Sequence, residues 1–202
     1  MSSPFDIEII NMLVKLNLNL IKVPSGEINN IPYLKRLGSF KKKIILSTGM
    51  SNLKEIITAI KILIKSGTPK SYISVLHCTS EYPTELKNAN LKSISFLKKK
   101  LGCKIGYSDH TIGSLASICA VILGAEIIEK HITLSNNMKG PDHQASLNVK
   151  KLYFFVNQLK SINSLYGSKF KKITDVEKKN SIHIRKSIFA KKKIYKGEIF
   201  LS

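Results

Sequence analysis

Two histidines that each follow a short strand-like run could bind one metal ion between them. His110 follows Gly106-Tyr107-Ser108-Asp109 and His131 follows Glu129-Lys130, while residues 112–124 between them carry the apolar spacing of a helix. This is the pattern of a β-strand, helix, β-strand unit. Successive strands of such a unit usually lie side by side and parallel, about 4.8 Å apart, so both imidazoles would reach the same edge of the sheet. We therefore expect the two histidines to be close enough to share a metal ion.

A lone histidine at a strand end is more often an ordinary hydrogen-bonded residue than a metal ligand. The equivalent positions of the two histidines favour the metal site, and so do the polar residues around them. Ser108 and Asp109 precede the first histidine, and Glu129 and Lys130 precede the second. For Glu129 and Lys130, a salt bridge between the two in the mouth of a barrel explains their presence nearly as well as direct catalysis does.

The composition is that of a globular protein without a membrane segment. The chain has 202 residues, of which 43% are hydrophobic, so it can bury a substantial core. No apolar run approaches the ~18 residues that span a bilayer, and the N-terminus lacks the basic and apolar regions of a secretory signal. Cys78, Cys103 and Cys119 have no metal-ligand spacing, which fits a reducing compartment. We expect a cytoplasmic protein with no membrane partner.

The formal charge of +20 does not indicate a nucleic-acid-binding protein. Arg36 and Arg185 are the only arginines, so the planar side chain that reads phosphates and guanine edges is almost absent. The lysines are spread over expected helix faces and loops, and a coding bias toward Lys, Asn and Ile explains them more simply. An anionic small substrate would benefit from the same positive field.

Short apolar runs alternate with amphipathic helices along the chain. Strands are expected at residues 20–23, 43–46, 73–76, 105–107 and 126–128. Helices are expected at residues 5–17, 29–37, 52–65, 91–101, 112–123 and 147–165. This alternation is the signature of a parallel α/β sheet. Every strand is followed by Ser, Thr, His, Lys or Asp, and in a (β/α)₈ barrel these strand ends form the active-site face.

The strands are too few for a closed barrel. With a stub at residues 1–3 there are about six, whereas a TIM (β/α)₈ barrel has eight strands and typically about 250 residues. We therefore expect an incomplete TIM barrel over residues 1–167, with the missing units upstream of Met1. Residues 168–181 are lysine-rich and read as a linker. The strand-like runs at 185–190 and 196–200 indicate the first hairpin of a second, truncated domain over residues 182–202.

These motifs together resemble the N-acetylneuraminate (sialic acid) synthase family. The resemblance covers nearly the whole chain, in order and with family-like spacing. The matching motifs are Ser2-Ser3-Pro4-Phe5-Asp6, Lys22-Val23-Pro24-Ser25-Gly26-Glu27, Leu46-Ser47-Thr48-Gly49-Met50, His77-Cys78-Thr79-Ser80-Glu81-Tyr82-Pro83, Gly106 to Thr111, Ile128 to His131 and Gly140-Pro141-Asp142-His143. Arg185-Lys186-Ser187-Ile188 resembles the start of the family's C-terminal antifreeze-like (SAF) domain. The resemblance implies that the N-terminal part of the barrel and most of the SAF domain are absent.

The family condenses phosphoenolpyruvate with N-acetylmannosamine, or a related 2-acetamido sugar, to a nonulosonic acid and releases phosphate. An enol carbon must attack an aldehyde, and a divalent ion that polarises the carbonyl oxygen is an efficient Lewis acid. By resemblance His110 and His131 are the metal ligands, with Mn²⁺ preferred and Mg²⁺ or Co²⁺ open. Glu129 lies close enough to orient water or a ligand and is grouped with them as catalytic. His77 and His143 are not assigned to the metal.

The resemblance also implies where the two substrates bind. Phosphoenolpyruvate needs fixed cations and hydroxyl donors, and Lys22 supplies the charge. Serines at successive strand ends line the anion site by resemblance, although each serine alone is more often a turn or cap residue: Ser3, Ser25, Ser47, Ser80 and Ser108. Ser80 stands where some members have asparagine. Tyr82 and Asp142 match positions that contact the amino sugar.

Three functions remain open for this chain. The first is a fragment of a sialic acid synthase-type enzyme, inactive on its own, whose complete form is a domain-swapped homodimer with an SAF-domain arginine reaching the partner's active site. Within it, legionaminic and pseudaminic acid synthases are alternatives, and the motif at residues 140–146 favours the neuraminic or legionaminic branch. The second function is another metal-dependent TIM-barrel aldolase or isomerase. The third is a non-catalytic remnant.

Overall fold

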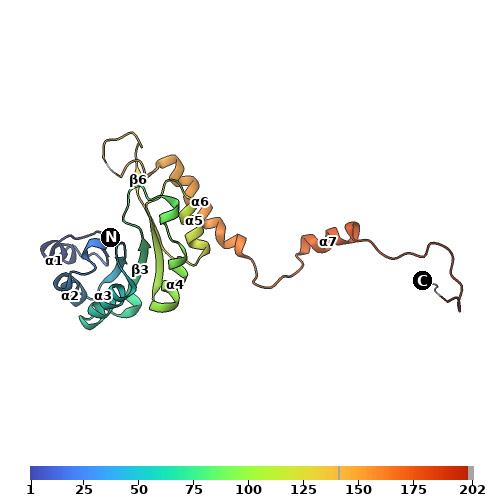
Figure 1. The fold of residues 1–202 in the computed structure, drawn as a ribbon, viewed down its shortest axis with the longest axis horizontal. Coiled ribbons are helices and arrows are strands. Elements are labelled where there is room, and N and C mark those ends of the chain that lie inside the picture. The colour runs from blue at the N-terminus through green and yellow to red at the C-terminus, as the bar shows by residue number, and fades with distance from the viewer. Residues whose placement is uncertain (141, 200–202) are drawn as a thin grey trace. The chain divides into compact units, whose positions relative to one another are not determined.

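Five short apolar runs form one parallel sheet in the computed structural model, which describes residues 1–140 and 142–199. The strands are β1 (Leu20–Val23), β2 (Lys43–Ser47), β3 (Ile73–Cys78), β4 (Lys104–Asp109) and β5 (Ile128–Lys130). They lie in the order β1-β2-β3-β4-β5, and each pairs in parallel with the next. The sheet curls into a half-barrel, so the expected incomplete TIM barrel is confirmed (Figure 1).

Helices connect the strands, as the sequence predicts. They are α1 (Ile7–Lys15), α2 (Ile31–Ser39), α3 (Leu53–Lys65), α4 (Lys92–Leu101), α5 (Leu115–Ile122) and α6 (Val149–Tyr166), with short 3₁₀ turns η1 (Ser25–Glu27), η2 (Lys70–Tyr72) and η3 (Leu86–Asn88). The start of α3 is fixed by a capping box, because the Asn52 side chain accepts from the backbone of Glu55 and the Glu55 carboxylate accepts from the backbone of Asn52. α4 ends at Gly102, whose φ of 60° is the left-handed conformation of a helix C-terminus.

The core lies between the sheet and these helices. Ile21, Ile44 and Ile73 are register partners on three adjacent strands, and each is 0–1% exposed. They pack in one cluster with the apolar faces of the helices, including Leu34 and Leu63. Such strands are apolar throughout because a parallel sheet is covered on its faces. This rigid layer fixes where each strand ends, and the strand ends carry the candidate site.

The strand limits differ from expectation where polar residues belong to the sheet. β3 and β4 extend two residues further than predicted, and β5 lies two residues later, at Ile128–Lys130 instead of 126–128. Glu129 and Lys130 are therefore strand residues, and His131 follows the strand directly. The expected stub at residues 1–3 forms one parallel bridge from Ser2 to Ile21.

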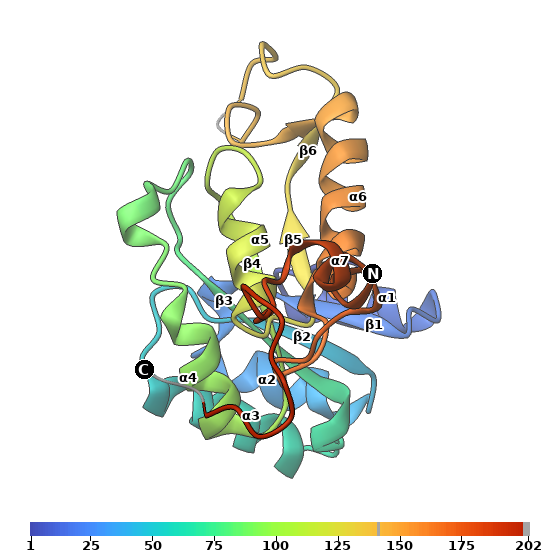
Figure 2. The ribbon, with the colours of Figure 1, turned by 90° about the vertical axis from the view of Figure 1, so that its right-hand side faces the viewer.

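A small second sheet was not predicted. β6 (Ile132–Thr133) pairs in parallel with β7 (Leu147–Asn148), which the apolar spacing had assigned to the following helix. Asn148 instead accepts from the backbone of Lys151, as a residue that caps a helix start does, so α6 begins at Val149. The chain after β6 rises at the same end as the segments after β3 and β4, beyond the strand ends (Figure 2).

Residues 166–202 form a separate unit from residues 1–165. Within it α7 (Asp175–Ile184) begins with a capping box between Thr174 and Glu177, so residues 175–181, half of the expected linker, are helical. The two strand-like runs, residues 185–190 and 196–199, do not form strands. Residues 200–202 lie outside the described part of the chain. The SAF domain stays a prediction. No helix in the described ranges is long and apolar enough to cross a membrane.

Candidate functional site

A cavity of about 460 Å³ opens at the C-terminal ends of the strands. It brings together residues from all five strands and from the N-terminal stub. The predicted site residues that line it are Ser3, Lys22, Ser25, Ser47, Ser80, Tyr82, Ser108, His110, Glu129 and His131. Asp142 does not line the cavity but lies beside it. The sequence argument that polar residues after parallel strands meet at one edge is thus what the structure shows for these residues.

The two histidine rings lie close together at this edge. Their centroids are 5.6 Å apart and the ring planes cross at 67°. The His110 ring is oriented by Nδ1, which lies 2.6 Å from the carbonyl oxygen of Thr79. The backbone of His131 is fixed through its carbonyl oxygen, which accepts from Leu147 over 2.9 Å. Asp142 joins the group through His131, with its Oδ2 3.9 Å from Nδ1.

His110 is buried and neutral, and its second nitrogen faces the cavity. Burial lowers the pKa of His110, and nearby His131 lowers it further. A carbonyl oxygen can only accept, so Nδ1 carries the proton and donates to Thr79. Nε2 is then left with a lone pair. Such a nitrogen is the form in which histidine binds a metal.

A chain of polar contacts runs from Lys22 to His110. Lys22 Nζ lies 3.1 Å from Oε1 of Glu129, and Ser108 donates to the same oxygen over 2.7 Å. The Ser108 oxygen is also 3.2 Å from Nε2 of His110. Because the single proton of Ser108 is directed at Glu129, two lone pairs face each other at Nε2. A cation or a donated proton at that point would be stabilised.

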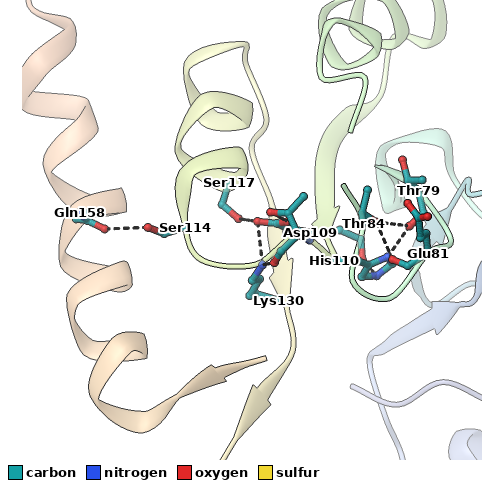
Figure 3. A network of polar contacts seen from close by, with 11 residues as sticks. Thr79, Glu81, Thr84, Asp109, His110, Ser114, Ser117, Lys130 and Gln158 are labelled. Carbon is teal, nitrogen blue, oxygen red and sulfur yellow. Dashed lines mark hydrogen bonds and ion pairs between the residues drawn. The ribbon is translucent and has the colours of Figure 1, made fainter. Parts of the chain in front are cut away.

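The salt bridge between Glu129 and Lys130, which was the alternative to a catalytic role, does not form. Successive residues of a strand point to opposite faces, so the two side chains diverge. Glu129 turns into the cavity toward Lys22, and Lys130 pairs with Asp109 at 3.2 Å behind it. Figure 3 shows Lys130 and Asp109 beside Ser117 of α5, with His110 on the other side of Asp109.

Tyr82 packs over the histidine pair. Its ring stacks on His110 with centroids 4.0 Å apart and meets His131 edge-on at 5.5 Å. Burial raises the pKa of Tyr82 to about 12, so its hydroxyl stays protonated near neutral pH. The phenol can therefore donate a hydrogen bond at the mouth of the cavity, where 44% of the residue is exposed.

The opposite wall of the cavity is built from serine hydroxyls and one close backbone turn. Ser25 Oγ accepts from the backbone of Gly49 over 3.0 Å and touches Cys78 Sγ at 3.3 Å. Ser47 is 3% exposed, and its Oγ is the only buried side-chain nitrogen or oxygen in the described residues that lacks a hydrogen-bond partner. An unpaired buried hydroxyl costs free energy, so it is the kind of group that a bound ligand satisfies.

A sequence model of the NeuB family matches residues 1–171. The chain belongs to the NeuB family. The N,N'-diacetyllegionaminic acid synthase of Campylobacter jejuni is 49% identical over 200 residues, which are 99% of this chain and 60% of that protein. The enzyme of the same name from Legionella pneumophila is 38% identical over 199 residues, or 98% of this chain and 56% of that one. The chain thus spans between 56% and 60% of these two relatives.

A solved structure shows the same fold. The N-acetylneuraminic acid (sialic acid) synthetase from Leptospira borgpetersenii, in complex with citrate, superposes with a TM-score of 0.80 at 35% identity. The superposition covers 90% of this chain and 62% of that one. The half-barrel described here therefore has the fold of a NeuB-family barrel over the part that the two share.

Members of the NeuB family are typically metal-dependent, and the donors in this chain fit a divalent ion. In the part of the chain that the structure describes, no group of three or more His, Cys, Asp or Glu side chains is arranged to hold one. The neutral Nε2 of His110 and the nearby imidazole of His131 are two donors of the kind that Mn²⁺ or Co²⁺ accepts. Two protein donors leave the other ligand positions to water and substrate, as in open catalytic sites.

The two histidines that were not assigned to a metal lie outside the cavity lining. His77 Nε2 is 2.9 Å from the carbonyl oxygen of Ala89, and Nδ1 of His143 is 2.8 Å from Thr133 Oγ1. His77 anchors the segment after β3, and His143 braces the segment that carries Asp142. Sequence reasoning gave no role to Cys78 or Gly49, which line or approach the cavity. Their places in the His77-Cys78-Thr79-Ser80 and Ser47-Thr48-Gly49-Met50 motifs were the available signal.

Proposed function

We propose that this NeuB-family chain carries the metal and phosphoenolpyruvate sites of a nonulosonic acid synthase. The enzyme would join phosphoenolpyruvate to the aldehyde of a 2-acetamido hexose and release phosphate. The observation that supports this most is one cavity that contains both the unpaired hydroxyl of Ser47 and the neutral nitrogen of His110. The first suits an anion and the second suits a metal ion.

The anion side of the site would hold phosphoenolpyruvate. Lys22 is 8% exposed, and its charge is only partly offset by Glu129 because that carboxylate also accepts from Ser108. A buried cation beside hydroxyl donors binds phosphate and carboxylate through charge-assisted hydrogen bonds. We assign this contact to Lys22 together with the serines that line the cavity: Ser3, Ser25, Ser47, Ser80 and Ser108.

The histidine side of the site would hold the aldehyde. His110 and His131 would bind Mn²⁺, or alternatively Mg²⁺ or Co²⁺, and the bound ion polarises a carbonyl oxygen as a Lewis acid. Tyr82 and Asp142 flank the same two rings, so we assign them to the hydroxyl and acetamido groups of the sugar. In this arrangement the methylene carbon of phosphoenolpyruvate attacks the aldehyde carbon, whose oxygen becomes a hydroxyl. Water adds to the phosphate-bearing carbon, which then loses phosphate and becomes a ketone.

Glu129 stands between the two sides. It accepts from both Lys22 and Ser108, so its carboxylate is held in place by two donors. We assign it the role of orienting the attacking water or a substrate hydroxyl toward the reacting carbon atoms. A carboxylate held this way acts without having to reorganise during the reaction.

The legionaminic branch is the product class that we favour. Two relatives named as N,N'-diacetyllegionaminic acid synthases are 49% and 38% identical to this chain. N-acetylneuraminic and pseudaminic acid remain the alternatives within the family. For the whole protein we propose a cytoplasmic, domain-swapped homodimer, with an SAF domain beginning near residue 182.

The test separates binding by this chain from turnover by a longer one. Calorimetric titration of the 202-residue chain with phosphoenolpyruvate in Mn²⁺ should give saturable binding, which Ser47→Ala weakens. A version extended upstream should release phosphate from phosphoenolpyruvate only when an acetamido hexose is added. N-Acetylmannosamine and a diacetamido hexose are compared as acceptors, and the mass of the product identifies the acid. If phosphoenolpyruvate does not bind, or phosphate is released without an acceptor sugar, the proposal is wrong.

A further inference from the structure

A buried ion pair joins the two strands that lead to the histidines. Asp109 is the last residue of β4 and Lys130 is the last residue of β5, and the two are register partners. Their charged groups are 3.2 Å apart, and their side chains are 0% and 3% exposed. Each member of the pair directly precedes a histidine in the sequence. The link therefore lies at the point where both strands leave the sheet.

Both members of the ion pair also form hydrogen bonds to neighbouring residues. One carboxylate oxygen of Asp109 accepts from the backbone and the hydroxyl of Thr111, each over 2.8 Å. The other accepts from Ser117 of α5 over 2.5 Å as well as from Lys130. Lys130 also donates to the carbonyl oxygen of Thr111. The carboxylate is thus fully occupied within the protein (Figure 3), and it acts on the site through the backbone instead of touching a ligand.

This network fixes His110 on both sides along the chain. Asp109 before it and Thr111 after it are bonded to each other and to Lys130 of the neighbouring strand. The carbonyl oxygen of His110 accepts from the backbone of Thr84 over 2.9 Å. A shift of the His110 backbone relative to His131 would therefore have to break these bonds.

Stability alone does not account for such a pair. Removing two charges from water costs free energy that their attraction roughly repays, so a buried ion pair is weak evidence for stability. Its advantage is geometric, since the charge and the fixed hydrogen bonds allow one register only. Residues that do not touch a metal can still orient its ligands and tune its affinity. Here the orientation would act through the backbone on either side of His110.

We propose that the Asp109–Lys130 pair is a positioning device that sets the separation of the His110 and His131 imidazoles and thereby the affinity of the site for Mn²⁺. This inference depends on the proposed function, because it takes the two histidines as the metal donors. It adds Asp109, Lys130 and Ser117 to the site as positioning residues.

The test measures the Mn²⁺ dissociation constant of folded protein by electron paramagnetic resonance, at a temperature well below the melting point. The double variant Asp109→Asn/Lys130→Met removes both charges but keeps the approximate shapes, so it leaves no unpaired buried charge. We expect it to bind Mn²⁺ about 10 to 100 times more weakly than the parent. The matched control is Lys98→Met/Glu126→Gln, which neutralises a half-exposed pair of the same 3.2 Å length between α4 and the residues before β5, away from the strand ends that carry the histidines. The control should bind Mn²⁺ like the parent.

A milder variant keeps the test decisive if the double variant does not fold. Ser117→Ala removes one hydrogen bond from Asp109 at a fully buried position and should weaken Mn²⁺ binding several-fold. If the folded double variant binds Mn²⁺ as tightly as the parent, the positioning role is wrong. If the double variant does not fold, unchanged binding in Ser117→Ala overturns it. If the parent does not bind Mn²⁺ at all, both this inference and the metal site of the proposed function fail, and phosphoenolpyruvate binding then tells whether the anion site survives.

Discussion

The Nδ1 nitrogen of His110 lies 2.6 Å from the carbonyl oxygen of Thr79, a residue 31 positions earlier in the chain. Because a carbonyl cannot donate, this contact fixes the tautomer with the proton on Nδ1 and a lone pair on Nε2. It also fixes the direction in which the ring faces. The segment after β3 therefore prepares His110 to act as a neutral donor into the cavity.

Removing either cavity histidine should remove the metal. His110→Ala or His131→Ala leaves one imidazole of the pair, which is too few protein donors to hold an ion. We expect each variant to retain little Mn²⁺ after dialysis. In an active, longer form of the protein, turnover should fall by roughly a thousandfold or more, because the Lewis acid supplies several kcal/mol. The measurement is bound metal by mass spectrometry beside the rate.

The control for this prediction is a histidine of the same unit outside the cavity lining. His143→Ala removes an imidazole that bonds to Thr133 instead of facing the cavity, so metal content should match the parent. Full metal occupancy in the His110 variant, or loss of metal in the His143 variant, would contradict the assignment.

Replacing Ser47 should weaken ligand binding without lowering the stability of the protein. Its buried hydroxyl has no partner in the protein, so Ser47→Ala should leave the melting temperature unchanged or slightly raised. Binding of phosphoenolpyruvate should weaken about 10- to 100-fold if the hydroxyl donates to the anion, since such bonds are worth about 1.5–3 kcal/mol. Thermal melts and calorimetric titration of the same sample check both effects.

Ser95 provides the opposite pattern as a control. Its hydroxyl donates to the carbonyl oxygen of Leu123 over 2.9 Å, and neither residue lines the cavity. Ser95→Ala should therefore lower the free energy of unfolding by about 1 kcal/mol and leave phosphoenolpyruvate binding unchanged. If Ser47→Ala behaves like Ser95→Ala, the Ser47 hydroxyl is not a ligand contact.

The parallel half-barrel could be predicted because Ile, Leu and Val runs recur at intervals typical of βα units. The strand ends were harder to predict. The expected strand range of 105–107 leaves out Ser108 and Asp109, yet both are paired in the sheet and at most 2% exposed. A buried polar residue that is satisfied by a distant partner looks, in the sequence, like a loop residue. Such a residue can be assigned to the strand only once the structure shows its hydrogen-bond partner.

The two-residue error in the predicted position of β5 also left the directions of the site side chains unpredicted. With Glu129 placed outside the strand, the alternation of side chains could not be applied, and a bond to Lys130 was a reasonable expectation. Once Ile128–Lys130 is the strand, period two places Glu129 on the cavity face and Lys130 behind it. The contact between His110 and Thr79 could not be predicted in any case, since a backbone carbonyl carries no side-chain signal.

A side chain at Gly49 should displace two serines of the cavity. A Cβ at this position would overlap Ser80 Oγ and lie 2.9 Å from Ser25 Oγ, and both hydroxyls line the cavity. Gly49→Ala should therefore displace the serines and weaken phosphoenolpyruvate binding at least tenfold. Gly26→Ala is the matched control, because Gly26 lines the same cavity but a Cβ there meets nothing within 4 Å. Equal binding by the two variants would show that the close approach at Gly49 is unimportant.

Stability should fall as the solution is acidified, and His77 should be one cause. Burial is the main reason that the pKa of His77 is lowered from its usual 6.5 in the folded protein. Below about pH 6.5 the unfolded chain takes up a proton at this residue that the folded chain does not, so protons favour unfolding. The contribution to stability is present above pH 6.5 and is lost progressively below it.

Urea unfolding with a chelator present should give a lower free energy of unfolding at pH 5 than at pH 7. His77→Gln, which keeps a donor for the Ala89 carbonyl but does not titrate, should narrow that difference. His183→Gln, at an exposed position of α7, tests the effect of losing a histidine as such. A pH difference in His77→Gln that equals the parent's would rule out His77 as a source of the acid sensitivity.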